Sequence, residues 1–229
     1  MPLVVAIDGP SGSGKSSTAR GVASKLGLDF LDTGAMYRAV TWLSMHVGVD
    51  RSNTEAVASL VRGARFDISV DPTMQRIAID GYDVTRAIRE PDVSAAVSMV
   101  ATNLSVREHL VAEQRRLIRS APRGIVAEGR DITTVVAPDA DVRVLLVADP
   151  AARVARRWAE LGEKVDTDAV TDQVIRRDRD DSTVAQFTDA APGVTVIDST
   201  ELSLAEVIES ICALVPAGAL SSGGDPTGS

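Results

Sequence analysis

The sequence has little cysteine and few aromatic residues. Its one cysteine, Cys212, excludes an intrachain disulfide in this chain of 229 residues. Because aromatic residues make up only 3%, a buried core must be built from aliphatic side chains. No apolar run reaches the roughly 20 residues that span a bilayer, and the segment Met1–Ile7 lacks the basic start of a signal peptide. We therefore expect a cytoplasmic protein without a membrane partner.

Positive charge is also scarce. The chain has 24 Lys and Arg against 32 Asp and Glu, and this net charge of −8 disfavours nucleic acid as a partner. Lysine occurs only at positions 15, 25 and 164, so arginine supplies most of the positive charge. Arginine can grip phosphate oxygens through two parallel hydrogen bonds, but composition does not separate such residues from ordinary surface arginines. We expect small-molecule substrates and a monomeric protein.

Apolar residues are plentiful enough for an ordered core, because the hydrophobic fraction of 45% excludes a disordered chain. Apolar runs typical of buried strands occur at Leu3–Ile7, Phe30–Leu31, Ile125–Ala127, Val142–Ala148 and Val194–Ile197. Helical patterns lie between them, for example at Lys15–Leu26, Ala35–Val47, Thr54–Val61 and Ala169–Arg179. This alternation predicts an α/β fold of three layers, with a parallel sheet between helices.

Local patterns add detail to this outline. Apolar and polar residues alternate between positions 65 and 85 on both sides of the turn Asp71–Thr73, which predicts a small antiparallel hairpin with Val84 as a third short strand. Capping boxes at Ser105–Glu108 and Ser203–Glu206 predict the starts of two helices. Residues 216–229 are rich in Gly and Ser and are expected to be a disordered tail.

The most specific motif directly follows the first strand. Residues 9–16 read Gly-Pro-Ser-Gly-Ser-Gly-Lys-Ser and match the phosphate-binding loop pattern G-x-x-x-x-G-K-S. Backbone amides of such a loop bind anions, Lys15 reaches the β- and γ-phosphates of ATP, and the Ser16 hydroxyl ligates Mg²⁺. The residues expected to contact ATP here are Gly9, Pro10, Ser11, Gly12, Ser13, Gly14, Lys15, Ser16 and Ser17.

Two further motifs follow predicted strands. Residues 32–38 read Asp-Thr-Gly-Ala-Met-Tyr-Arg and open a helix, which places Arg38 to hold a second phosphate; an ordinary capped helix with a surface arginine fits equally well. Glu128, Arg130 and Asp131 follow the run Ile125–Ala127. The Glu128 carboxylate is expected to organise Mg²⁺ indirectly, and the alternative is a plain charged turn.

Together with Arg177-Asp-x-x-Asp181-Ser, these motifs resemble those of bacterial cytidylate kinases, in family order over about residues 3–215. The resemblance implies in-line transfer of the γ-phosphoryl group of ATP to CMP or dCMP. It also implies one P-loop kinase domain, 1–215, with a core (1–33, 121–150 and 190–215), a monophosphate-binding region that carries the β insertion (34–120) and a helical lid (about 151–189).

The resemblance also assigns roles to individual positions. Catalysis is assigned to Lys15, Arg38, Arg130 and Glu128. The acceptor phosphate is assigned to Thr33 and Arg38, and Arg130 is assigned to bridge toward the phosphates. The cytosine is assigned to Ser98, Arg107 and Asp131, the ribose to Arg177 and Asp181, and ATP to Arg156 and Arg157. One assignment has a physical check, because a carboxylate accepts a hydrogen bond from the 4-amino group of cytosine and repels the 4-oxygen of uracil.

The chain departs from the family pattern at three positions, and the mildest departure is Glu128, which stands where some members have Asp. Val184 stands where an arginine that contacts phosphate is expected, and Thr133 stands where glycine is frequent. The positive charge of the missing arginine would have to come from Arg156, Arg157, Arg177 or Arg179. Two alternatives stay open: another P-loop kinase acting on UMP, dTMP or shikimate, and a non-catalytic nucleotide-binding module, which Val184 favours.

Overall fold

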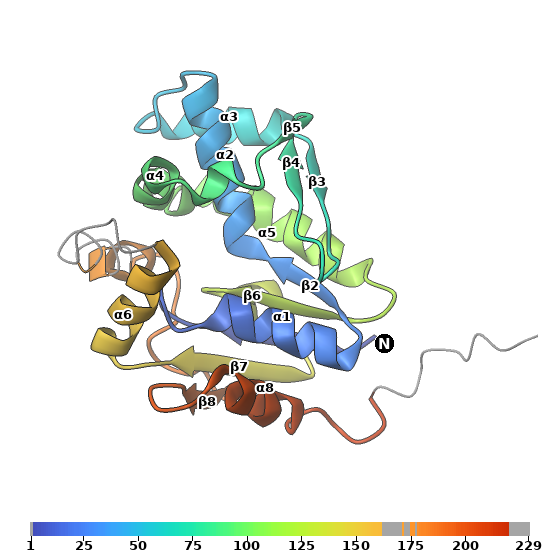
Figure 1. Cartoon of the computed structure of the whole chain (residues 1–229). Helices are drawn as coiled ribbons and strands as arrows, with labels where there is room; N and C mark the ends of the chain where they lie inside the picture. Colours follow the sequence, from blue (N-terminus) through green and yellow to red (C-terminus); the bar gives the residue numbers. More distant parts are fainter. Residues whose placement is uncertain (1, 162–170, 172–174, 177, 220–229) are drawn as a thin grey trace, which may run out of the picture.

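The computed structural model describes residues 2–161, 171, 175, 176 and 178–219. Within these residues the centre is a five-stranded sheet in the order β2-β6-β1-β7-β8 (Figure 1). The strands are β1 (Val4–Asp8), β2 (Asp29–Asp32), β6 (Ile125–Gly129), β7 (Val142–Val147) and β8 (Thr195–Asp198). Every neighbouring pair is parallel, so these strands all end at one edge of the sheet. The prediction of an α/β fold with a parallel sheet is confirmed.

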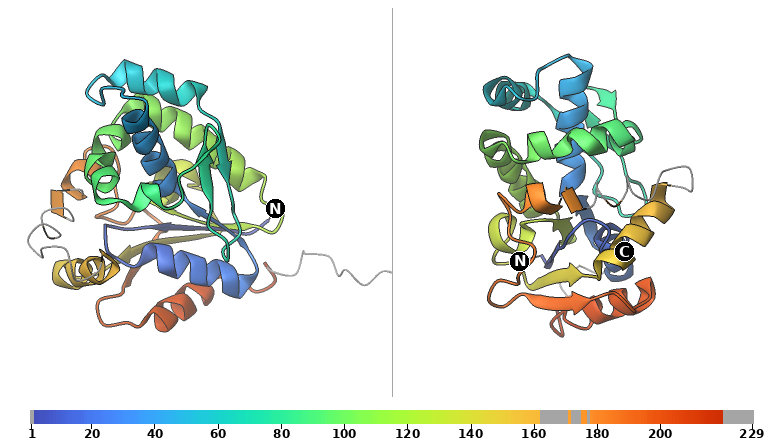
Figure 2. Two further views of the ribbon diagram at one scale, coloured as in Figure 1. Left: turned by 45° about the horizontal axis from the view of Figure 1, so that its top comes forward. Right: turned by 90° about the vertical axis from the view of Figure 1, so that its left-hand side faces the viewer.

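Helices cover both faces of the sheet, which makes three layers (Figure 2). On one face, Val22 and Ile211 pack with Ile7 of β1; on the other face, Met36 and Leu110 belong to a second apolar cluster. The strands read as continuous apolar runs because both faces are covered. The helices are α1 (Lys15–Leu26), α2 (Thr33–His46), α3 (Thr54–Gly63), α4 (Pro91–Ala101), α5 (Leu104–Arg119), α6 (Pro150–Leu161) and α8 (Leu204–Cys212), with the short turns η1 (Ala87–Arg89) and η2 (Ile132–Val136).

The predicted hairpin is present as a small antiparallel sheet of β3 (Phe66–Ile68), β4 (Ile77–Ile79) and β5 (Tyr82–Asp83). It lies beside α2 in the upper part of Figure 1. The expected place of the third strand was wrong by one or two residues. Val84 follows β5 instead, and its side chain is fully buried while its amide donates to the carbonyl of Ile77 at 3.0 Å.

The two predicted capping boxes have opposite outcomes. The box at Ser203–Glu206 is confirmed at the start of α8. The box at Ser105–Glu108 is wrong, because Asn103 caps α5 instead and its side-chain oxygen accepts from the amides of Ser105 and Val106. The Asn103 side chain also donates to the carbonyl of Thr54 at 2.8 Å, and this tertiary contact fixes the start of the helix earlier in the chain.

Some expectations fall outside the described residues. The helix predicted at Ala169–Arg179 and the tail at 216–229 both lie mostly there. In the part of the chain that the structure does describe, no helix combines the length and the apolar character needed to cross a bilayer.

Candidate active site

A pocket of about 400 Å³ opens where β1, β2 and β6 end. Open α/β sheets bind ligands at such carboxyl ends. Four carboxylates line this pocket: Asp32, Glu128, Asp131 and Asp181. The cationic residues that line it are Lys15, Arg20, Arg38, Arg89, Arg107, Arg130 and Arg157. The excess of cations suits a ligand that carries several negative charges.

The phosphate-binding loop forms one wall of the pocket between β1 and α1. Gly12 has a φ of 74°, and a Cβ there would lie 2.4 Å from the carbonyl oxygen of Arg153, so glycine is required. The Lys15 ammonium donates to the carbonyl of Pro10 at 3.1 Å. Of the nine predicted loop residues, six line the pocket: Ser11, Gly12, Gly14, Lys15, Ser16 and Ser17. The other three, Gly9, Pro10 and Ser13, are not among its lining residues.

Ser16 and Glu128 meet at the floor of the pocket. The Ser16 hydroxyl donates to the Glu128 carboxylate at 2.6 Å. Burial raises the pKa of Glu128, the charge of Asp32 raises it further, and Lys15 opposes both. The described residues contain no cluster of three His, Cys, Asp or Glu side chains that could hold a metal. Two protein oxygens suit Mg²⁺, which takes its other ligands from water and substrate phosphates.

The second predicted anion site is built around Asp32. Its carboxylate caps α2 by accepting from the Ala35 amide and also accepts from Arg38 and Arg89, each at 2.9 Å. Burial alone would raise the pKa of Asp32, but Arg38 and Arg89 outweigh burial and hold that pKa well below its usual range. Arg38 is only 8% exposed, and its buried Nε has no hydrogen-bond partner among the described residues. Arg38 is therefore not a surface arginine. Nearby, the Thr33 hydroxyl donates a hydrogen bond to the backbone carbonyl of Glu128 at 2.7 Å.

At the other end of the pocket, Arg107 of α5 forms an ion pair with Asp131. Burial raises the pKa of the Asp131 carboxyl, and Arg107 opposes the rise. Val97 and Ala101 of α4 add an apolar wall. The predicted base contact Ser98 lies on the same helix without lining the pocket, so its role stays a prediction.

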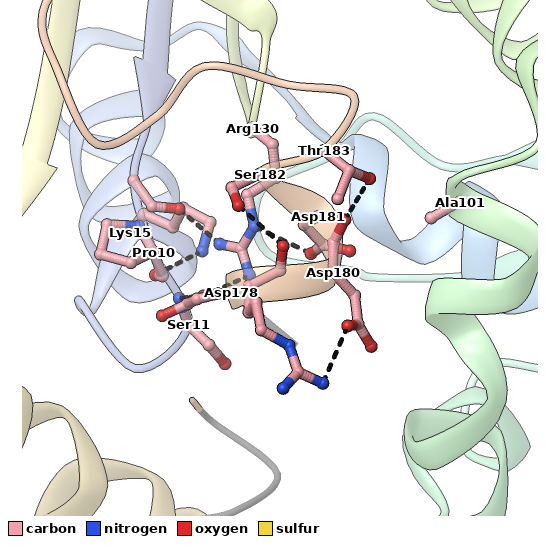
Figure 3. A network of polar contacts seen from close by, with 12 residues as sticks. Pro10, Ser11, Lys15, Ala101, Arg130, Asp178, Asp180, Asp181, Ser182 and Thr183 are labelled. Carbon is pink, nitrogen blue, oxygen red and sulfur yellow. Dashed lines mark hydrogen bonds and ion pairs between the residues drawn. The ribbon is translucent and has the colours of Figure 1, made fainter. Parts of the chain in front are cut away.

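Arg130 is held over the loop by several partners (Figure 3). Its guanidinium donates to Asp181 at 3.2 Å, to Asp178 at 3.3 Å and to the carbonyl of Gly9. Asp178 also accepts from the amide of Ser11 at 2.9 Å, which ties this segment to the phosphate-binding loop. Phe187 lies against the guanidinium, with 4.7 Å between the Arg130 carbon and the ring centre. The predicted ribose contact at position 177 lies outside the described residues.

The two lid arginines predicted for ATP differ in position. Arg157 lines the pocket. Arg156 donates to the hydroxyl and carbonyl of Ser199 at 3.0 and 2.6 Å, and Ser199 in turn donates to the carbonyl of Ser13. Arg156 thus links α6 through Ser199 to the phosphate-binding loop at Ser13. Its contact with ATP stays a prediction. Val184 is half-buried and is not among the pocket residues.

Among the polar and charged lining residues, sequence reasoning missed three that belong to no motif: Arg20, Gln75 and Arg89. Arg20 extends from α1 toward the hairpin, where the Gln75 side-chain oxygen accepts from it at 3.2 Å with the amide group suitably turned. No spacing rule links these positions, because the hairpin meets α1 only in the folded chain.

Comparisons with known proteins agree with this geometry. The family model described as cytidylate kinase matches residues 5–217. A cytidylate kinase of Cutibacterium acnes is 58% identical over 217 residues, covering 94% of this chain and 96% of that protein. One from Streptomyces avermitilis is 43% identical over 218 residues, covering 93% and 92%. A solved structure of an uncharacterised protein from Eubacterium ventriosum has a TM-score of 0.52 over 93% of this chain and 98% of that chain; at 11% identity this is a likeness of fold alone.

Proposed function

The chain belongs to the cytidylate kinase family, and we propose that its pocket binds the acceptor nucleotide between Arg38 and Asp131, with ATP on the loop of residues 9–17. The chain is a nucleoside monophosphate kinase that transfers a phosphoryl group from ATP to CMP and dCMP, giving CDP and dCDP. The observation that carries the assignment of the acceptor site is the buried guanidinium of Arg38, whose Nε has no hydrogen-bond partner in the part of the chain that the structure describes.

The acceptor phosphate fits the group of Arg38, Arg89 and Arg130. Arg38 and Arg89 share the single negative charge of Asp32, so these three side chains together keep one positive charge, which a phosphate can neutralise. A guanidinium also matches the spacing of two phosphate oxygens. Thr33 lines the same region, although its hydroxyl donates a hydrogen bond to the backbone carbonyl of Glu128. Contact between Thr33 and the phosphate would therefore use the backbone of Thr33 or a rotated side chain.

The base fits the opposite end, at Asp131 and Arg107. The Asp131 carboxylate would accept from the 4-amino group of cytosine, while uracil would present an oxygen there and leave two acceptors facing each other. The buried surroundings of Asp131 make that mismatch costly, because an unsatisfied polar group cannot turn to water. The ribose would lie between these ends, beside Asp181.

Transfer requires neutralisation of charge and exclusion of water. The acceptor is a phosphate monoester with a second pKa of about 6, so its attacking oxygen is already ionised at neutral pH and needs no general base. Neither His46 nor His109 lines the pocket. Lys15, Arg38, Arg130 and Arg157 would reduce the repulsion between the two nucleotides, which favours in-line attack on the γ-phosphate.

Mg²⁺ would be held at Ser16, with Glu128 ordering its shell through the hydrogen bond between the two side chains. The ion, when bound, supplies charge neutralisation at the phosphates. The family resemblance and the paired oxygens support this assignment. The cytoplasmic location, the monomeric state and the absence of nucleic-acid or membrane partners stay predictions.

A coupled assay with ATP and five acceptors, CMP, dCMP, UMP, AMP and shikimate, tests the proposal. We expect transfer to CMP and dCMP and a much lower rate with UMP; preference for UMP would overturn the reading of the base by Asp131. Lys15→Ala should abolish transfer while the variant stays folded, because it removes the cation at the phosphates. Wild-type protein that binds ATP and CMP without transfer would support the non-catalytic alternative.

A further inference from the structure

The residue assigned to base recognition directly precedes an unusual element. Asp131 leads into η2, a π turn, and this geometry is rare and often lies at functional sites. The carbonyl of Asp131 accepts from the amides of Val135 and Val136 at 2.8 and 3.0 Å. The first amides of such a turn point out of it and need acceptors from elsewhere in the molecule. The direction of Asp131 therefore depends on what holds the turn.

The acceptor for these first amides is Asp8, the last residue of β1. One carboxylate oxygen accepts from the Ile132 amide at 2.8 Å, and the other accepts from the Thr133 amide at 2.8 Å and its hydroxyl at 2.7 Å. Asp8 is 1% exposed, so these donors are what offset its removal from water. Burial raises the pKa of Asp8 to about 6, and the bonds from Thr133 and Ile132 oppose the rise. The Thr133 hydroxyl supplies the third of these donors to the Asp8 carboxylate.

The far end of the turn is held by Arg115 of α5. Its guanidinium donates to the carbonyls of Val136 and Val135 at 3.2 and 2.6 Å. The same helix brings Arg107 to the Asp131 carboxylate. Asp131 is thus fixed through its side chain and through both ends of the turn that follows it.

We propose that η2, held by Asp8 and Thr133 at one end and by Arg115 at the other, positions Asp131 for base recognition and so sets the preference for cytosine over uracil. The inference rests on the proposed function, because it takes Asp131 as the group that faces the base. Asp8, Thr133 and Arg115 are positioning residues: none of the three is needed to touch the nucleotide. Asp8 also directly precedes Gly9, so one strand end orders both the ATP loop and the base-reading segment.

The first test removes only the hydroxyl of Thr133. In Thr133→Val, we expect the ratio of kcat/KM for CMP to that for UMP to fall about threefold to tenfold, the factor that one hydrogen bond contributes. The KM for ATP should change less than twofold. Thr133→Ser should restore the ratio, because serine keeps the hydroxyl. Thr134→Val is the matched control: it makes the same chemical change at the next residue of η2, whose side-chain hydroxyl forms no hydrogen bond with the described residues.

The second test approaches the turn from its other end, at the exposed side chain of Arg115. Arg115→Gln should lower the same ratio, while Arg119→Gln, an equal loss of charge one turn further along α5, should not. Thermal melts of each variant separate loss of fold from loss of selectivity. A ratio unchanged in Arg115→Gln, or equal in Thr133→Val and Thr134→Val, would overturn the inference. Wild-type protein that fails to phosphorylate CMP would instead refute the proposed function.

Discussion

At the scale of single residues, the acceptor site that we propose depends on the guanidinium of Arg38, which the fold removes from water. The carboxylate of Asp32 compensates the charge of Arg38 only in part, because Arg89 shares it at the same distance of 2.9 Å. Burial lowers the pKa of Arg38, but an arginine remains charged at neutral pH. The remaining positive charge and the buried Nε of Arg38 favour an anion at this end of the pocket.

Replacement of Arg38 tests this reading. In Arg38→Gln, we expect kcat/KM for CMP to fall about thirtyfold or more, since truncating one partner of a buried, hydrogen-bonded charge pair costs roughly 2–5 kcal/mol of binding and each 1.36 kcal/mol is tenfold. Arg89 remains to pair with Asp32, so the variant should fold. Steady-state kinetics with each substrate varied in turn measure the effect. A parallel rise in KM for ATP would show that Arg38 does not act on the acceptor alone.

The residues that sequence reasoning found are those in motifs. The loop of residues 9–16 and the segment 32–38 have fixed local spacing, so Lys15 and Arg38 were predictable from pattern. Arg89 was not, because it reaches Asp32 across 57 positions from a short turn without a motif. Sequence could name Arg38 as a candidate, but only its burial in the structure excluded an ordinary surface arginine.

At the scale of elements, the start of α5 depends on Asn103. In Asn103→Ala, we expect the free energy of unfolding to fall by about 1–2 kcal/mol, because the helix loses its cap and the bond to Thr54 is also lost. Ser105→Ala should change it by less than about 0.5 kcal/mol, since the Ser105 side chain does not cap the helix. Urea denaturation of both variants measures the difference. Equal losses would contradict the role of Asn103.

The same contrast shows which elements are predictable. The strands of the main sheet were found because burial on both faces leaves an apolar run in the sequence. The capping box at Ser105 misled because a local pattern competes with Asn103, whose partner Thr54 is 49 positions away. The π turn has no local signal, since the group that holds its start, Asp8, is 124 positions from Ile132. The periodic pattern of apolar residues does not predict elements that are stabilised by side chains distant in the sequence.

At the scale of the whole molecule, the order of the strands assembles the site. Pairing of β6 between β2 and β1 brings Asp8, Asp32 and Glu128 to one edge of the sheet, although they are far apart in the sequence. The alternation of strands and helices predicts that these ends share an edge, but it does not give the order. The order also decides that Asp8 becomes fully enclosed, and this burial links the stability of the molecule to pH.

Burial raises the pKa of Asp8 from 3.8 to about 6, with Asp131 adding to the rise and the bonds from Thr133 and Ile132 opposing it. The folded state therefore holds this proton more tightly than the unfolded state does, so the contribution of Asp8 to stability is full below about pH 4 and is lost as pH rises through about 6. At 1.36 kcal/mol per pKa unit, the change is roughly 3 kcal/mol.

Asp8→Asn has no titrating group at this position, so the difference in unfolding free energy between wild type and variant isolates the effect. Urea denaturation at several pH values should show that this difference, taken as wild type minus variant, falls by roughly 3 kcal/mol between pH 4 and pH 7. A difference that stays constant over this range would show that the buried carboxylate keeps its ordinary affinity for the proton, and a difference that grows as pH rises would show that folding lowers this affinity; either result would contradict the prediction.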